Sequence, residues 1–118
     1  MRIFAALGLV CLLTGCAPDQ PAKQAEEIGS IAAEGALLAH GAAEGSSTKI
    51  FVREHAEALD RRLGKTRSVV DDRRLESLAA SVSEELVRLA EEPGDELTTR
   101  SVERTLERRS REAAELME

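Results

Sequence analysis

Apolar side chains recur at intervals of three and four residues along most of the chain, the spacing that places them on one face of a helix. Four such stretches follow one another, and the third is the clearest, with apolar residues at Leu75, Leu78, Val82, Leu86 and Leu89. No stretch alternates apolar and polar residues over a useful length, so no strand is expected. The pattern predicts an all-α protein.

The first stretch, residues 22–43, has an unusually small apolar face. Gly35 and Ala39 lie four residues apart on it, so we expect a neighbouring helix to pack closely there. The second stretch ends near residue 63, and its sequence does not decide which residues form the buried face. Its stripe begins at Phe51 or Val52, continues at His55 or Ala56, and ends at Leu59 and Leu63.

Capping and breaking residues mark the expected helix ends. Gly41 and Gly45 should end the first helix, and Ser46 or Ser47 should cap the second. Gly64 suits the C-terminal cap of the second helix and Ser68 the N-cap of the third. Pro93-Gly94 should stop the third helix, and Asp95 precedes the fourth.

The fourth stretch has the weakest apolar stripe, because Arg109 and Ser110 stand where another apolar residue is expected between Leu106 and Ala113. Short connections make sequential helices antiparallel neighbours. We therefore expect an up-down-up-down four-helix bundle over residues 25–118. The alternative is that the third and fourth helices form a looser hairpin or dimerise.

Residues 1–16 have the organisation of an export signal. Arg2 precedes an apolar run over residues 3–13, which is too short to span a bilayer. The quartet Leu13-Thr14-Gly15-Cys16 resembles the lipobox of bacterial lipoproteins. This resemblance implies a signal peptide over residues 1–15 that is cleaved before Cys16. It also implies acyl chains such as palmitate on Cys16, and residues 16–24 would then tether the domain to the membrane.

The resemblance also implies a place in the cell envelope. The membrane would be a partner through the lipid anchor, which holds the domain on the extracytoplasmic face. Ala17 follows the cysteine where an aspartate would favour retention at the inner membrane. We therefore expect the outer membrane in a diderm, and the outer leaflet of the plasma membrane in a monoderm.

Composition and motifs argue against several functions. The chain has a net charge of −6, which argues against nucleic acid as a partner. Both cysteines, Cys11 and Cys16, lie in the first sixteen residues, so the remaining chain has no thiol nucleophile or thiolate metal site. No Gly-x-Ser-x-Gly elbow or phosphate-binding glycine loop is present. We expect a protein that is not an enzyme and has no cofactor.

One basic stripe departs from the overall acidity. Arg104, Arg108 and Arg111 lie at spacings of four and three, so they share one side of the fourth helix. They could contact an anionic partner such as lipid headgroups, cell-wall polymers or another protein. The alternative is a solvated face balanced by neighbouring glutamates.

Residues 25–63 loosely resemble exported ferritin-like bundle proteins of unknown function. The elements that carry the likeness are Glu34-Gly35-Ala36-Leu37-Leu38, and Lys49-Ile50-Phe51 followed by His55 and Leu59. The resemblance implies a metal-binding or stress-related bundle. Of the ligands such a site needs, only Glu34 and His55 are candidates here, because the third and fourth stretches contain no histidine.

Two hypotheses follow for the domain. The first is a non-enzymatic, membrane-anchored lipoprotein that serves as a protein-interaction or structural module and binds an envelope protein or its own copy. The second is the ferritin-like metal-binding bundle.

Overall fold

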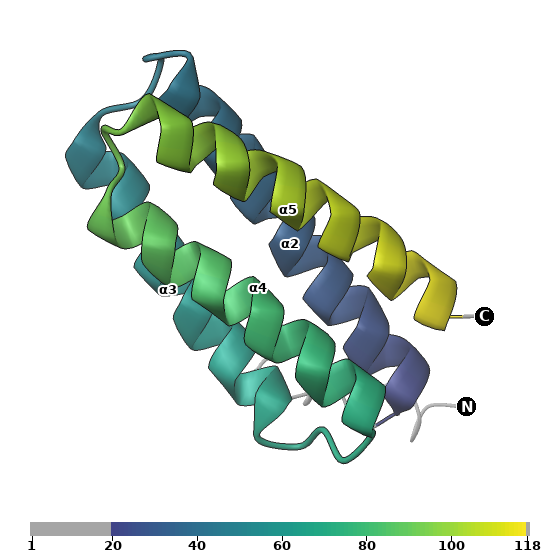
Figure 1. The fold of residues 1–118 in the computed structure, drawn as a ribbon. Helices are drawn as coiled ribbons and strands as arrows, with labels where there is room; N and C mark the ends of the chain where they lie inside the picture. The colour runs from purple at the N-terminus through teal and green to yellow at the C-terminus, as the bar shows by residue number, and fades with distance from the viewer. Residues whose placement is uncertain (1–19, 118) are drawn as a thin grey trace, which may run out of the picture.

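The computed structural model describes residues 20–117, so Cys16, the lipobox and the signal segment lie outside the described residues. The described chain folds into four helices: α2 (Pro21–Ala43), α3 (Lys49–Arg67), α4 (Arg73–Glu91) and α5 (Glu96–Leu116). They run alternately up and down around one core (Figure 1), and residues 20–117 contain no strand. The structure confirms the predicted four-helix bundle.

Two ends of the bundle are used below as reference points. The tip is the end where α2 connects to α3 and α4 connects to α5. The base is the opposite end, where α2 begins, α3 connects to α4, and α5 ends (Figure 1). Because α2 begins at Pro21, residues 21–24 of the expected tether are already helical, and Gln24 is buried. The helical part of the chain therefore begins four residues before the boundary at residue 25 that the sequence indicated.

The first and last helices form the most extensive helix pair. A Cβ atom at Gly29 of α2 would lie 3.0 Å from Cβ of Ala113 on α5. A Cβ atom at Gly35 would lie 2.8 Å from Cδ1 of Leu106. These distances confirm that the small-residue face of α2 admits a close neighbour, and that this neighbour is α5.

The core is aliphatic throughout. Its larger side chains come from all four helices and include Ile28, Ile31, Leu63, Leu86, Leu89 and Leu106, all fully buried. In α3 the buried stripe uses Val52 and Ala56, while Phe51 and His55 lie on the surface. This settles the register that the sequence left open.

The fourth helix packs on the core despite its weak apolar stripe, so the looser hairpin of the third and fourth helices, which the sequence left as an alternative, is not observed in the described residues. Val102, Leu106 and Ala113 are completely buried, and Thr99 is buried beside them with its hydroxyl donating to the carbonyl of Glu96. Arg109 leans toward α4, where Nε donates to Oγ of Ser81 at 2.8 Å. Arg109 and Ser110, which interrupt the apolar stripe of α5, therefore lie at an edge of the core. The narrow apolar stripe of α5 packs against the small-residue face of α2.

Three expected caps are also corrected. Thr48, not Ser46 or Ser47, caps α3, and its Oγ1 accepts from the amide of Phe51 at 3.1 Å. Asp72, not Ser68, caps α4 by accepting from the amides of Arg74 and Leu75. The third correction concerns the end of α3, which continues through Gly64 to Arg67. Asp95 caps α5 as expected.

Gly45 ends the first helix, as predicted, with a positive φ of 73° that glycine adopts without strain. Gly41, in contrast, stays inside the helix. None of the four described helices is both long enough and apolar enough to cross a lipid bilayer.

Candidate functional site

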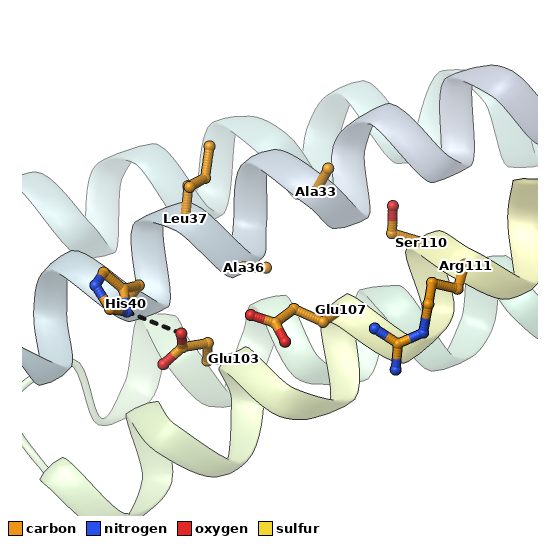
Figure 2. Close-up of a pocket in the computed structure, with 8 residues that line it drawn as sticks. All are labelled: Ala33, Ala36, Leu37, His40, Glu103, Glu107, Ser110 and Arg111. Carbon is orange, nitrogen blue, oxygen red and sulfur yellow. Dashed lines mark hydrogen bonds and ion pairs between the residues drawn. The ribbon is translucent and has the colours of Figure 1, made fainter.

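An open groove of about 500 Å³ runs along the bundle between α2 and α5. Its apolar part comes from α2, where Ala33 and Leu37 are exposed and Ala36 is buried. Figure 2 shows Ala36 directed toward α5, while Leu37 projects from the outer side of α2. Leu37 is 73% exposed, so the groove has a large and mostly exposed apolar side chain at its rim.

The opposite wall of the groove is polar and comes from α5. It consists of Glu103, Glu107, Ser110 and Arg111. The groove thus has an apolar wall on α2 that faces a row of polar and charged groups on α5.

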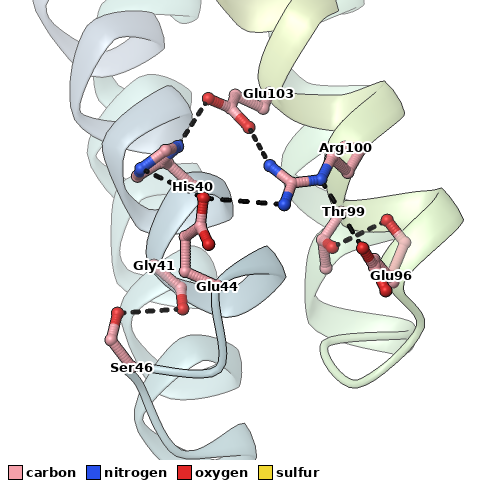
Figure 3. Close-up of polar contacts among 8 residues, drawn as sticks. All are labelled: His40, Gly41, Glu44, Ser46, Glu96, Thr99, Arg100 and Glu103. Atoms are coloured by element: carbon pink, nitrogen blue, oxygen red, sulfur yellow. Dashed lines mark hydrogen bonds and ion pairs between the residues drawn. The ribbon is translucent and has the colours of Figure 1, made fainter.

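A network of charged side chains closes the groove toward the tip (Figure 3). Nδ1 of His40 lies 2.8 Å from Oε2 of Glu103, and Nε2 lies 3.8 Å from Oε1 of Glu44. Arg100 reaches both carboxylates, at 3.5 Å from Glu44 and 3.8 Å from Glu103.

This network ties the end of α2 to the start of α5, and its residues differ in how well they are shielded. The side chain of Glu103 is 16% exposed, whereas those of His40 and Glu44 are about half exposed. His40 precedes Glu44 by four residues on one helix, so this contact has a local signal in the sequence. Glu103 and Arg100 were missed because nothing local to α5 shows which of its charged residues face α2.

The groove does not assemble a nucleophile with a base. Ser110 is the groove's one hydroxyl, and it lies seven residues along α5 from Glu103, which corresponds to about 10 Å of helix rise. His40 is held by Glu103 at the other end of the groove. A serine–histidine pair needs hydrogen-bond contact between the two side chains.

The predicted arginine stripe lies on the outer surface of α5. Arg104, Arg108 and Arg111 are all exposed, and Arg111 also lines the groove. Arg104 and Arg111 form no ion pair with any residue in the described range, and Arg108 donates only to the hydroxyl of Thr105, at 3.4 Å. Apart from that hydrogen bond, the three guanidinium groups are free to bind an anionic partner.

The two candidate metal ligands are placed apart. Glu34 accepts from Arg62 of α3, with 3.1 Å between Arg62 Nη1 and Oε1. His55 precedes Arg62 by seven residues on the same helix, so it lies about 10 Å nearer the tip. There its ring packs on Phe51, with 5.4 Å between ring centroids. Within residues 20–117, no group of three or more histidine, cysteine or acidic residues is arranged to hold a metal ion.

Arg62 is the centre of a second, structural ion-pair cluster. Its Nε donates to Glu27 at 2.5 Å, and its Nη1 donates to Glu34. The hydrogen bond to Glu27 raises the pKa of Arg62 above its ordinary value, and the bond to Glu34 adds to this effect against the opposing effect of burial. The carboxylate of Glu34 is thus engaged in fastening α2 to α3.

Comparison of this chain with protein-family models, with curated proteins and with solved structures gives no match.

Proposed function

We propose that this protein is a lipid-anchored lipoprotein of the cell envelope, whose helical bundle is a non-enzymatic interaction module that binds a second copy of itself. The signal segment and the Leu-Thr-Gly-Cys quartet support the anchor. The observation that carries the interaction module is the groove between α2 and α5, where Leu37 is 73% exposed and Arg111 has no acidic partner in the described chain.

The anchor restricts how two copies can meet. Both would be tethered to one membrane at the base, so their helices must run in the same direction. A two-fold axis along the bundle then places α5 of each copy over α2 of the other. The arginine stripe of α5 would lie against the outer side of α2, which presents Leu37 and the exposed carboxylate of Glu26.

This arrangement would be complementary in charge and in shape. The long arginine side chains can cover Leu37 with their methylene groups while their guanidinium groups reach carboxylates. Confinement to one membrane raises the effective concentration of each copy, so a modest interface would suffice.

The anchor is tested by the intact mass of protein extracted from membranes. We expect a chain that begins at Cys16 and carries added acyl mass, and a Cys16→Ala variant that is uncleaved or released from membranes. Cys11→Ala is the matched control and should behave as wild type. An unmodified chain that still begins at Met1 would refute the lipoprotein proposal.

Self-association is tested by cross-linking in native membranes. With Cys11 removed and Cys16 acylated, Leu37→Cys provides one free thiol per copy, and a flexible bifunctional maleimide should give a covalent dimer. Ala58→Cys, which places a thiol on the exposed side of α3, is the control and should remain monomeric. Equal yields for the two variants, or cross-links only to other proteins, would exclude the groove as a self-contact.

A further inference from the structure

The base of the bundle carries a second surface, distinct from the groove. We propose that it rests on the lipid surface, with Val69 and Met117 in the headgroup region and the surrounding basic residues on anionic phosphates. This inference depends on the proposed anchor at Cys16 and adds how the domain is oriented on its membrane.

The length of the tether brings the base to the membrane. Because α2 begins at Pro21, only residues 16–20 separate the acylated cysteine from the first helical turn. Five extended residues span at most about 17 Å. The domain therefore cannot move farther than about half of a bilayer's width from the headgroups.

The apolar residues at the base lie beside this attachment point. Gln24, in the first turn of α2, donates from Nε2 to the carbonyl oxygen of Val69 at 3.2 Å. This bond holds the connection between α3 and α4 against the start of α2. Val69 is 43% exposed, and Met117 at the end of α5 is 45% exposed, so the base presents two apolar side chains where the tether enters.

Charge distinguishes the base from the tip. The base, taken as its connection and the adjoining helical turns, has these basic residues: Lys23, Lys65, Arg67, Arg73 and Arg74. Its acidic residues are Asp71, Asp72, Glu76 and Glu115, of which Asp72 caps α4 and Glu76 is bound by Arg67 at 2.8 Å. Lys23, Lys65, Arg73 and Arg74 are exposed and form no ion pair within the described range.

The tip has the opposite character. Over its two connections and the four adjoining residues of each helix, the acidic residues are Glu44, Glu91, Glu92, Asp95 and Glu96, and the basic residues are Lys49 and Arg88. Arg100, the next residue of α5, pairs with Glu44 and Glu96. An anionic lipid surface attracts the base and repels the tip. The charge distribution therefore favours the same orientation as the tether, with the bundle standing on its base.

A site-specific probe can test this orientation in the acylated, full-length protein. With Cys11 replaced, Val69→Cys and Leu97→Cys each provide one free thiol, at the base and at the tip respectively. Each variant is labelled with an environment-sensitive fluorophore and reconstituted into vesicles of phosphatidylcholine and phosphatidylglycerol that contain a headgroup-attached quencher. We expect severalfold stronger quenching at position 69 than at position 97.

Charge variants provide the second measurement. In the Val69→Cys background, Arg73→Gln together with Arg74→Gln should lower the quenching, and vesicles of phosphatidylcholine alone should lower it in the same way. Arg53→Gln together with Arg61→Gln, on the exposed side of α3, is the charge-matched control and should leave the quenching unchanged.

The intact mass of the same samples separates this inference from the proposed function. Acylated protein with equal quenching at positions 69 and 97 would overturn the orientation while leaving the anchor in place. If quenching at position 69 were unchanged both by the Arg73→Gln and Arg74→Gln replacements and by the removal of anionic lipid, the role assigned to the basic residues would be overturned. An intact mass without added acyl groups would instead refute the anchor at Cys16.

Discussion

Gly35 of α2 lies directly against Leu106 of α5: a methyl group at Gly35 would come within 2.8 Å of Cδ1 of Leu106 and 3.0 Å of Cδ2 of Leu86. The most extensive helix pair in the bundle thus depends on the absence of a side chain at Gly35. The consequence for stability can be measured, because the chain offers a second helical glycine with open space around it.

Gly35→Ala and Gly64→Ala should act in opposite directions. Both replace a glycine inside a helix, which by itself stabilises by roughly 0.5–1 kcal/mol. At Gly64 nothing lies within 4 Å of the added methyl group, so that variant should gain this amount. At Gly35 overpacking costs about 1–3 kcal/mol, so the free energy of unfolding should fall. Urea unfolding followed by circular dichroism measures both; a Gly35→Ala variant as stable as Gly64→Ala would contradict the close contact.

Leu106→Ala and Leu97→Ala compare two leucines of one helix. Leu106 is completely buried, so its truncation should cost about 2–5 kcal/mol. Leu97 is 82% exposed, and its truncation should change the unfolding free energy by no more than about 0.5 kcal/mol. The same unfolding assay applies. Similar losses for the two variants would mean that α5 has a different register on the bundle.

Asp72→Ala should destabilise α4, because its side chain accepts from two amides at the start of that helix. The expected loss is roughly 0.5–2 kcal/mol. The neighbouring Asp71 is exposed and forms no cap, so Asp71→Ala should change stability by only a few tenths of a kcal/mol. Thermal melts of the two variants test the cap; a larger effect at position 71 would argue against it.

Arg62→Met should weaken the attachment of α3 to α2 by removing the contacts with Glu27 and Glu34. The side chain of Arg62 is 40% exposed, so solvent screens these pairs and we expect a loss of only about 1 kcal/mol. The loss should shrink as salt is added. Arg61→Met, at an exposed position without an ion pair in the described chain, is the control. No salt dependence of the difference would show that the cluster contributes through packing alone.

The number of helices, their order and most core positions could be predicted from the sequence, because an apolar stripe of period 3.6 is a local signal. Leu75 to Leu89 in α4 is an example: five periodic positions predict one buried face, and all five are buried. Helix ends were less predictable. Glycine is common at helix ends, so Gly64 was expected to end α3. Leu63 and Thr66 on either side of it are buried, and their packing keeps the last turn of α3 helical.

The groove could be predicted only in part. The small face of α2 and the arginine stripe of α5 are visible in the sequence, since each lies on one helix. The His40–Glu103 contact joins residues 63 positions apart, and it depends on how α2 and α5 are aligned. The apolar pattern within either helix does not predict how the two helices are aligned.

The pairing of α2 with α5 also affects how the chain reaches its folded state. The ribosome makes the partner of α2 last, after α3 and α4. Until residues 96–116 have emerged, the glycine and alanine face of α2 is uncovered, although α3 can already pack on α2 and on α4. A chain interrupted near residue 95 would lack the largest helix contact in the molecule, and such incomplete chains expose apolar surface that proteases and chaperones recognise. Completion of synthesis thus becomes a condition for a closed bundle.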